Sequence, residues 1–326
     1  MRVILTHAQL YAEEFQALLR SSYVGVTVGN FDGFHLGHLA LVRDLFSKTN
    51  FPSGLRLLLT FNPHPRVFLS TENQQRIQTR LQQLSELSLT TFRERVIEAE
   101  KLGFDVFIVA HFSKRFAQLT SGEFVKKYIV DSLHSRLVVV GHDFHFGKGR
   151  EGNVDSLRSL GKLHGFETSI IPPCLHEGVR VSTSMIKQLL VQGEIALVNK
   201  FLGREYSIYG RVVSGIDRGK QLGFPTVNIQ SYKYMIPAEG IYAAKVEYAG
   251  RRYLAACNIG KRPTFGKGSL VTEAHIIDYD GPALYGERIG LAFQERLRDE
   301  QRFSNEEELK AAISNDIEQV RSINSH

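Results

Sequence analysis

A glycine-rich turn at residues 29–38, with the sequence Gly-Asn-Phe-Asp-Gly-Phe-His-Leu-Gly-His, constrains the fold of this chain more than any other stretch. An apolar run at residues 24–28 precedes the turn, and apolar residues at helical spacing follow it, among them Leu41, Val42 and Leu45. This order predicts a buried strand, a tight turn and a helix. We therefore expect the stretch to form the first strand–turn–helix unit of a larger sheet.

The glycines of this turn favour a phosphate ligand. Glycine lets the backbone approach a ligand closely, and the start of a helix offers unpaired N–H groups and a positive dipole end. His35 and His38 are three residues apart, so both imidazoles are expected on one side of the first helical turn, where each can donate a hydrogen bond to phosphoryl oxygen. A surface turn with two plain histidines is an alternative. A metal site is a weaker one, because no cysteine pair or carboxylate stands nearby at a matching spacing.

The composition is that of an ordinary globular protein. Its 326 residues, 43% hydrophobic and 23% charged, are enough for two domains with separate cores. Cys174 and Cys257 are far apart in the sequence, so we expect free thiols in a reducing cytoplasm. The N-terminal apolar run is too short for a signal peptide, and no later run approaches about 18 uninterrupted apolar residues, so no membrane partner is expected.

The net charge of +6 favours anionic small molecules as ligands. Nucleic acid is the weaker interpretation, because the sequence has no dense block of lysine and arginine with interleaved aromatic residues. We therefore expect small-molecule partners and no nucleic acid. No oligomeric state is predicted.

Apolar runs and helical patterns alternate through the first half of the chain. Four further buried strands are expected at residues 55–61, 104–110, 137–140 and 168–171. This alternation predicts an α/β fold with a doubly wound parallel sheet covered on both faces. Ligands bind such sheets beyond the carboxyl ends of the strands, where the turn and the loops after residues 61 and 140 fall. Residues 62–65, Asn-Pro-His-Pro, are expected to form a rigid loop that neither continues the strand nor starts a helix cleanly.

The pattern changes near residue 200. From Tyr206 onward, short strand patterns follow one another at close intervals, with a hairpin turn at Ala249-Gly250. They predict an antiparallel β-barrel or sandwich, closed by a helix with a capping box at Ser304 and Glu307. The helical run 185–202 is assigned mainly to the first domain, so the predicted domains are residues 1–190 and 191–326.

The ten-residue turn resembles the Gly-x-Phe-Asp-Gly-x-His-x-Gly-His signature of the nucleotidylyltransferase superfamily, in the form found in bacterial bifunctional riboflavin kinase/FAD synthetases. The resemblance implies that the turn binds ATP and that His35 and His38 are catalytic. It also implies flavin contacts from Asn62 and His64. The residues of the turn that it assigns to nucleotide binding are Gly29, Phe31, Asp32 and Gly37.

Two later segments resemble further parts of that family. Residues 141–152 resemble its Gly-x-Asp-Phe-x-Phe-Gly loop, which implies that Asp143 helps to hold ATP. The formal Gly-x-Gly-x-x-Gly at 147–152 is not interpreted as a dinucleotide site, because it does not directly follow a first strand. Residues 182–187 are similar to Ile-Ser-Ser-Thr-x-x-Arg, which places Thr183, Ser184 and Lys187 on the ATP phosphates, although an ordinary helix cap would have a similar sequence. Lys187 replaces the family's arginine and loses its bidentate geometry, and His145 stands where arginine is common.

Residues 219–228 resemble the glycine loop and the Pro-Thr-Ala-Asn motif of riboflavin kinases. A P-loop at 215–221 is rejected, because the motif is one residue short and ends in glutamine. Thr226 and Asn228 alternate along an expected strand and present two neutral oxygens to one side, which suits a Mg²⁺ that shares its ligands with ATP phosphates. The nucleotide-binding residues that the resemblance implies in this loop are Gly219, Lys220 and Gly223.

Glu273 is a carboxylate inside an expected strand, where carboxylates are uncommon. The resemblance implies that it is the catalytic base of the kinase, accepting the proton of the ribityl 5′-hydroxyl of riboflavin. The segment 298–303, in family order, implies a flavin contact from Arg298.

Together these matches imply an enzyme that uses Mg²⁺ and ATP to convert riboflavin to FMN and FMN to FAD. One rival is a riboflavin kinase whose N-terminal domain binds nucleotide without turnover, favoured by Lys187 and His145. Another is a flavin-binding regulator without enzymatic activity. Glu273 argues against the regulator, because a sensor needs no catalytic base.

Overall fold

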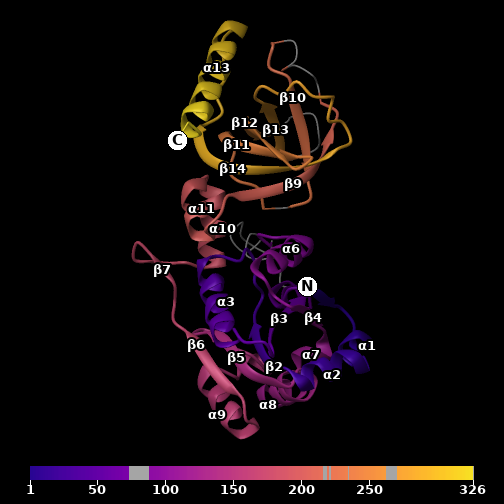
Figure 1. Ribbon diagram of the computed structural model, residues 1–326. Helices are drawn as coiled ribbons and strands as arrows, with labels where there is room; N and C mark the ends of the chain where they lie inside the picture. Colours follow the sequence, from indigo (N-terminus) through magenta and orange to yellow (C-terminus); the bar gives the residue numbers. More distant parts are fainter. Residues whose placement is uncertain (73–87, 216–218, 220–221, 234, 262–269, 326) are drawn as a thin grey trace. The chain divides into compact units, whose positions relative to one another are not determined.

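The computed structural model describes residues 1–72, 88–215, 219, 222–233, 235–261 and 270–325 (Figure 1). The chain divides into two compact units, residues 1–86 with 90–182 and residues 87–89 with 183–326. We predicted a boundary between residues 190 and 191. The compact units divide between Ser182 and Thr183, so that α10 (Thr183–Gln192) and α11 (Ile195–Leu202) group with the second unit, and the boundary at residue 190 stays a prediction.

The first unit is built on a parallel sheet, which in the described residues has six strands in the order β1-β4-β3-β2-β5-β6. The order reverses beside β2, because β3 and β4 lie on one side of it and β5 and β6 on the other. The strands are β1 (Arg2–Ile4), β2 (Tyr23–Val28), β3 (Gly54–Asn62), β4 (Val106–His111), β5 (Ser135–Gly141) and β6 (Glu167–Ile171).

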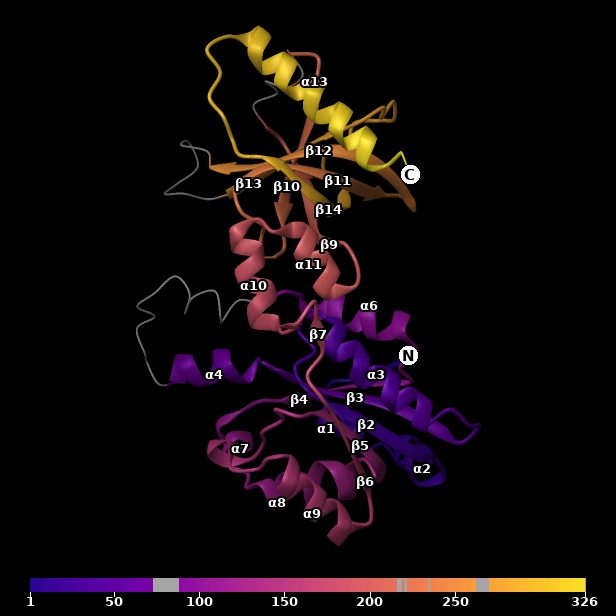
Figure 2. The same ribbon diagram turned by 90° about the vertical axis from the view of Figure 1, so that its left-hand side faces the viewer.

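Helices cover both faces of this sheet, which confirms the doubly wound prediction. Leu57 and Leu59 pack with α2 and α9 in one core, whereas Leu58 packs with α3 and α6 in another. Figure 2 shows α3 and α6 on one side of the strands and α8 and α9 on the other. The helical segments are α1 (His7–Leu10), α2 (Glu13–Ser21), α3 (Leu36–Lys48), α4 (Pro65–Glu72), α6 (Phe92–Leu102), α7 (Lys114–Ala117), α8 (Ser121–Phe124), η1 (Val125–Ser132), η2 (Lys148–Arg150) and α9 (Val154–His164).

Two features of the first unit differ from expectation. Strand β1 and helices α1 and α2 precede the predicted first unit, because three residues of strand are too few for a periodic signal. The Asn-Pro-His-Pro segment also does more than form a loop, since β3 runs through Asn62 and α4 begins at Pro65. Proline suits the first position of a helix, where its missing N–H would have no helical partner.

The second unit is a closed antiparallel barrel in the order β10-β13-β12-β11-β14-β9. The sequence left a barrel and a sandwich open, and the structure selects the barrel. A two-stranded hairpin of β7 (Leu175–His176) and β8 (Val179–Arg180) belongs to the first unit. The elements of the barrel are β9 (Tyr206–Val213), β10 (Thr226–Ser231), β11 (Gly240–Tyr248), β12 (Arg251–Lys261), β13 (Leu270–Ile276) and β14 (Arg288–Arg298).

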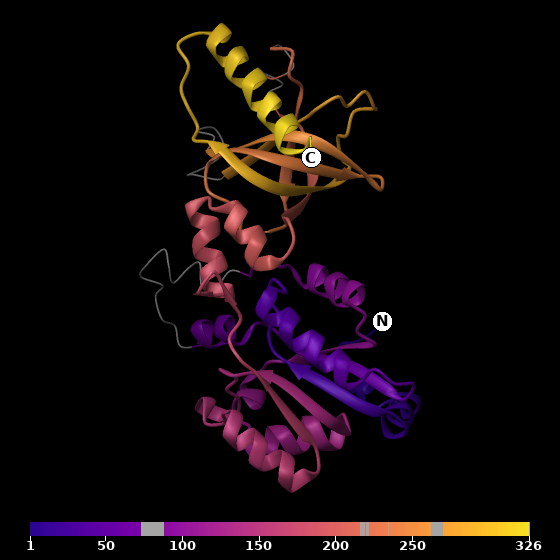
Figure 3. The same ribbon diagram turned by 60° about the vertical axis from the view of Figure 1, so that its left-hand side comes forward.

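The C-terminal helix α13 (Glu306–Ile323) packs on the outside of the barrel (Figure 3). Val320 and Ile317 meet Ala243 and Ala256 of β11 and β12. The helix cap is Asn305, whose Oδ1 accepts a hydrogen bond from the Glu308 N–H at 2.8 Å. The predicted box at Ser304 and Glu307 was therefore one residue too early.

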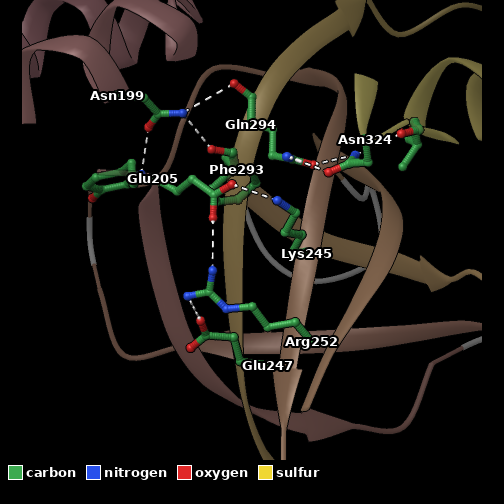
Figure 4. Close-up of polar contacts among 10 residues, drawn as sticks. Asn199, Glu205, Lys245, Glu247, Arg252, Phe293, Gln294 and Asn324 are labelled. Atoms are coloured by element: carbon green, nitrogen blue, oxygen red, sulfur yellow. Dashed lines mark hydrogen bonds and ion pairs between the residues drawn. The ribbon is translucent and has the colours of Figure 1, made fainter. Parts of the chain in front are cut away.

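Helix α11 is tied to the barrel by polar contacts (Figure 4). The Asn199 amide donates to the carbonyl oxygens of Phe293 and Gln294 at 2.8 and 3.2 Å and accepts from the Tyr206 N–H at 2.7 Å. Glu205, which lies between α11 and β9, pairs with Lys245 of β11 at 3.2 Å. These contacts explain why α11 groups with the barrel.

Candidate active sites

The glycine-rich turn lies at the carboxyl end of β2, where the strand order reverses. His35 is the N-cap of α3, and its Nδ1 accepts a hydrogen bond from the His38 N–H at 3.3 Å. The two imidazole rings are stacked, with centroids 3.7 Å apart and planes 16° apart. The spacing of the two histidines therefore brings them together on one side of the first turn, as predicted.

The capping role of His35 decides which ring nitrogen carries its proton. Because Nδ1 accepts from a backbone N–H, a neutral His35 ring has its proton on Nε2. An Nε2–H group is the donor that a phosphoryl oxygen requires. His35 is only 7% exposed, so such a hydrogen bond would form in a largely dry environment where it is strong.

Buried aromatic rings support the turn. Phe31 and Phe34 are both inaccessible, and the Phe31 ring lies 5.0 Å from the His38 ring. Glycine at position 29 suits this packing, because a Cβ there would lie 3.2 Å from the Phe31 ring, a tight contact. A Cβ on Gly37 would likewise lie 3.1 Å from the His35 ring. Phe31, predicted as a nucleotide contact, therefore lies beneath the histidine pair.

Asp32 is also buried, with 3% of its surface exposed. Its Oδ1 accepts hydrogen bonds from the Thr90 N–H and from Thr90 Oγ1, each at 3.0 Å. The carboxylate predicted to contact nucleotide is thus engaged with a residue just before α6.

Two loops at the same edge of the sheet carry other predicted residues. Asp143, exposed in the loop after β5, accepts from Arg180 Nη2 of β8 at 2.5 Å. Asn62 is exposed at the end of β3, and His64 is half-buried just before α4. The first unit therefore brings the turn, Asn62, His64 and Asp143 to the carboxyl end of its sheet.

Thr183, Ser184 and Lys187 belong to the second unit, at the start of α10. Thr183 is half-buried, Ser184 is exposed, and Lys187 is only 8% exposed. The helix start expected from the sequence is therefore present.

A polar row crosses three strands of the barrel. Asn228 of β10 lies directly opposite Glu273 of β13, and Glu273 lies directly opposite Asn258 of β12. Opposed residues of antiparallel strands point to the same face. That face is the outer one, because the alternating residues Ala274 and Cys257 are fully buried in the barrel. Thr226, two residues before Asn228, shares the face as predicted.

The backbone at Gly215 and Gly219 packs closely against Thr226 and Asn228, the two predicted metal ligands. A Cβ on Gly219 would lie 3.2 Å from Thr226 Oγ1, and a Cβ on Gly215 would collide with the Asn228 amide. Gly223 has a φ of 90°, which favours glycine. Lys220 lies outside the described residues. Close backbone approach therefore explains why glycines flank Thr226 and Asn228.

The surroundings of Glu273 include a buried amide oxygen. Asn258 Oδ1 is buried, and among the described residues it has no hydrogen-bond partner. Burial, together with the Glu273 carboxylate, raises the pKa of the Cys257 thiol, so Cys257 stays protonated behind the row. Buried oxygens without a partner are uncommon, and each needs a physical explanation.

Arg298 is held by the C-terminal helix. Its Nε and Nη2 donate to the two oxygens of buried Asp316 at 2.8 and 2.7 Å, and its guanidinium lies 5.8 Å from the Phe303 ring. Arg298 is opposite Ile241, which is opposite Asn258, so one apolar residue separates Arg298 from the polar row. The bidentate pair fixes its direction.

Sequence reasoning missed four residues beside these sites. Three of them, Thr90, Arg95 and Arg180, bond to distant segments. The capping pattern Thr91-x-x-Glu94 stands next to Thr90 and Arg95 and is the sequence signal closest to them. The four residues are Thr90, Arg95, Arg180 and Asn258.

The two units define a class of protein, a nucleotide-dependent transferase with two sites. Paired histidines stand at a helix start in one unit, and a carboxylate stands opposite a strand asparagine in the other. The family model for FAD synthetase matches residues 19–185, and the model for riboflavin kinase matches residues 202–324. The chain belongs to the bifunctional riboflavin kinase/FMN adenylyltransferase family.

Named relatives match nearly the whole chain. The bifunctional riboflavin kinase/FMN adenylyltransferase of Escherichia coli strain K12 is 35% identical over 89% of this chain and 90% of that protein. The enzyme of the same name from Haemophilus influenzae is 32% identical over 91% of this chain and 92% of that protein. The similarity therefore spans both units.

A solved structure shares the fold. A crystal structure described as a macrolide-efflux protein from Streptococcus pneumoniae superposes with a TM-score of 0.82, at 28% identity over 92% of this chain and 94% of that one. The similarity to that protein concerns the fold. Within the described residues of this chain, no helix has the length and apolar character needed to span a membrane.

Proposed function

We propose that this chain phosphorylates riboflavin to FMN in its barrel and then transfers an adenylyl group from a second ATP to FMN, which yields FAD and pyrophosphate. The presence of both sites in one chain is the observation that carries the proposal. The stacked histidines serve nucleotidyl transfer, and the row of Asn228, Glu273 and Asn258 serves the kinase.

In the kinase reaction, Glu273 accepts the proton of the ribityl 5′-hydroxyl as that oxygen attacks the γ-phosphorus of ATP. The bond from the γ-phosphorus to the bridging oxygen breaks, and ADP leaves. Glu273 lies between Asn228 and Asn258 on the neighbouring strands, so its carboxylate is at the centre of the polar row. Gly219 and Gly223 bring the loop backbone close to the phosphates, and Lys220 supplies a positive charge.

The residues around Glu273 fit a magnesium ion. Thr226 and Asn228 present neutral oxygens on one face, and Asn258 Oδ1 is a buried oxygen that has no partner in the described part of the chain. Among the residues that the structure describes, no cluster of three or more His, Cys, Asp or Glu side chains is placed to hold a metal. Mg²⁺ would therefore take neutral protein oxygens together with ATP phosphates, whose charge it would neutralise.

In adenylyl transfer, an oxygen of the FMN phosphate attacks the α-phosphorus of ATP, and pyrophosphate leaves. His35 and His38 donate hydrogen bonds to the phosphoryl oxygens, and the backbone at Gly29 and Gly37 allows ATP to approach closely. Phe31 and Asp32 support the turn that binds the nucleotide. Direct contacts with ATP are proposed for Asp143, Thr183, Ser184 and Lys187.

Flavin binding is proposed for Asn62 and His64 in the first unit and for Arg298 in the second. Riboflavin, FMN and ATP are the proposed partners, without nucleic acid. The cytoplasm is the proposed location, and the two free cysteines, Cys174 and Cys257, fit a reducing compartment.

Lysine at position 187 favours the rival function, a riboflavin kinase with a silent N-terminal unit, because lysine lacks the bidentate fork of arginine. A time course with riboflavin and Mg-ATP separates the two functions. The proposed function predicts that FMN appears first and FAD follows at its expense. FMN that accumulates without FAD would support the rival.

A further inference from the structure

The glycine-rich turn has backbone angles that need stabilising contacts from other parts of the first unit. Phe31, Gly33 and Phe34 have φ values of 48°, 92° and 44°, all in the left-handed region. Residues other than glycine adopt such values at a cost and do so where surrounding contacts determine the conformation. His35, which caps α3, comes directly after this stretch. The conformation of residues 31–34 therefore sets where the histidine pair stands.

Thr90 makes three hydrogen bonds to this stretch. Its N–H and its hydroxyl both donate to Asp32 Oδ1 at 3.0 Å, and the Gly33 N–H donates to Thr90 Oγ1 at 3.1 Å. The hydroxyl both donates and accepts, which neither a methyl group nor a carboxylate can do. Thr90 is 4% exposed, so water does not replace these bonds.

Arg95, in the first turn of α6, also bonds to the glycine-rich turn. Its Nη1 donates to the Asn30 carbonyl oxygen at 3.1 Å and to Thr60 Oγ1 at 3.4 Å. Burial lowers the pKa of Arg95, and the Asp32 carboxylate opposes that shift. Arg95 is 6% exposed, and a buried guanidinium is tolerated where such partners are present.

The helix that carries Arg95 does not need the Thr90 side chain. The N-cap of α6 is Thr91, whose hydroxyl accepts from the Glu94 N–H at 3.3 Å while Glu94 Oε2 accepts from the Thr91 N–H at 2.7 Å. The cap of α6 is complete within residues 91–94. The side chain of Thr90 therefore serves the turn and not the helix.

We propose that Thr90 and Arg95 are positioning residues for adenylyl transfer, because they hold Asn30, Asp32 and Gly33 in the conformation that aims the turn and the histidine pair at the phosphates. The inference rests on the proposed adenylyl transfer and deepens it. Asp32 then acts through the turn and not by contact with ATP.

The test uses the full chain with Thr90→Val, which keeps the shape but removes the hydroxyl, and Thr90→Ser as the matched control. Thr90→Val is expected to lower kcat/KM for FAD formation by roughly 10- to 100-fold, the loss that corresponds to an unsatisfied buried polar group. The loss should fall on kcat and on the KM for ATP. Thr90→Ser should stay within about threefold of the parent, because it keeps the hydroxyl. Arg95→Met should behave as Thr90→Val does.

Riboflavin phosphorylation by the same molecules reports whether the variants are folded. It should be unchanged in all three variants. The proposal is overturned if Thr90→Val makes FAD at the parental rate, if Thr90→Ser falls as far as Thr90→Val, or if kinase activity falls in parallel. Amide exchange supplies a readout that does not depend on turnover. The Gly33 N–H should exchange faster in Thr90→Val and as in the parent in Thr90→Ser. If the parent makes no FAD, the proposed function fails, and exchange alone then decides the role of Thr90.

Discussion

Glu273 stands in the middle of a strand, between Asn228 and Asn258 on its two neighbours. Glutamate is uncommon in the middle of a strand, because β-branched and aromatic residues are favoured there. A functional role would explain its presence at this position. Its two directly opposed cross-strand neighbours are neutral amides. The local arrangement suits a base that acts beside a metal-bound phosphate.

Replacing Glu273 by glutamine should remove the base and little else. Glu273→Gln is expected to lower the kinase kcat by roughly 10²-fold or more, while riboflavin and ATP still bind. FAD formation from added FMN serves as the control, and it should not change. A variant that phosphorylates riboflavin at the parental rate would show that the proton leaves by another route.

Asn258 offers a second test at the residue scale, because its buried Oδ1 has no partner among the residues that the structure describes. If this oxygen faces the magnesium site, Asn258→Ala should raise the magnesium concentration that gives half-maximal kinase activity, by roughly fivefold or more. Titration of both activities with MgCl₂ provides the measurement. An unchanged magnesium dependence of the kinase would remove Asn258 from the site.

The elements were largely predictable, because local signals determine them. Helix α6 ends at Gly103, as its left-handed φ of 94° requires, and each long strand was visible as an apolar run. Strand β1 was missed because it has three residues, and the strain at Phe31 and Phe34 was invisible because no sequence pattern reports it. The bonds from Thr90 to Asp32 span 58 residues, a separation at which periodicity carries no information.

The cap of α13 tests one of the corrected elements. Asn305→Ala should lower the free energy of unfolding of the barrel unit by about 0.5–2 kcal/mol, because it removes the acceptor for the Glu308 N–H. Ser304→Ala is the matched control and should be close to neutral, since no helix N–H bonds to its side chain in the described structure. Urea unfolding followed by circular dichroism measures both. Equal losses would contradict the assignment of Asn305 as the cap.

At the scale of the whole molecule, the chain holds two separately packed units, and the kinase unit includes α10 and α11. The Leu190 carbonyl oxygen accepts from the Ala238 N–H at 3.0 Å, and Gly193 packs against Arg296. The end of α10 therefore packs with the barrel.

Two fragments test this boundary. Residues 183–326 should fold and make FMN from riboflavin, whereas residues 191–326 should unfold at a lower urea concentration. The second fragment loses α10 and at least one hydrogen bond worth about 0.5–1.5 kcal/mol. Equal unfolding midpoints would favour the boundary predicted from the sequence, between residues 190 and 191.

The central claim is that one chain carries both reactions, and adenylyl transfer is the more demanding half because Lys187 replaces an arginine. The most direct measurement supplies the purified chain with FMN and Mg-ATP and follows FAD and pyrophosphate. We predict both products in equal amounts, with loss of FAD and retention of riboflavin phosphorylation when His35 and His38 are both replaced by alanine. Lys187→Arg should leave FAD formation unchanged or improve it. Absence of FAD from the parent chain, with FAD restored by Lys187→Arg and His145→Arg together, would contradict the claim and leave the protein a riboflavin kinase.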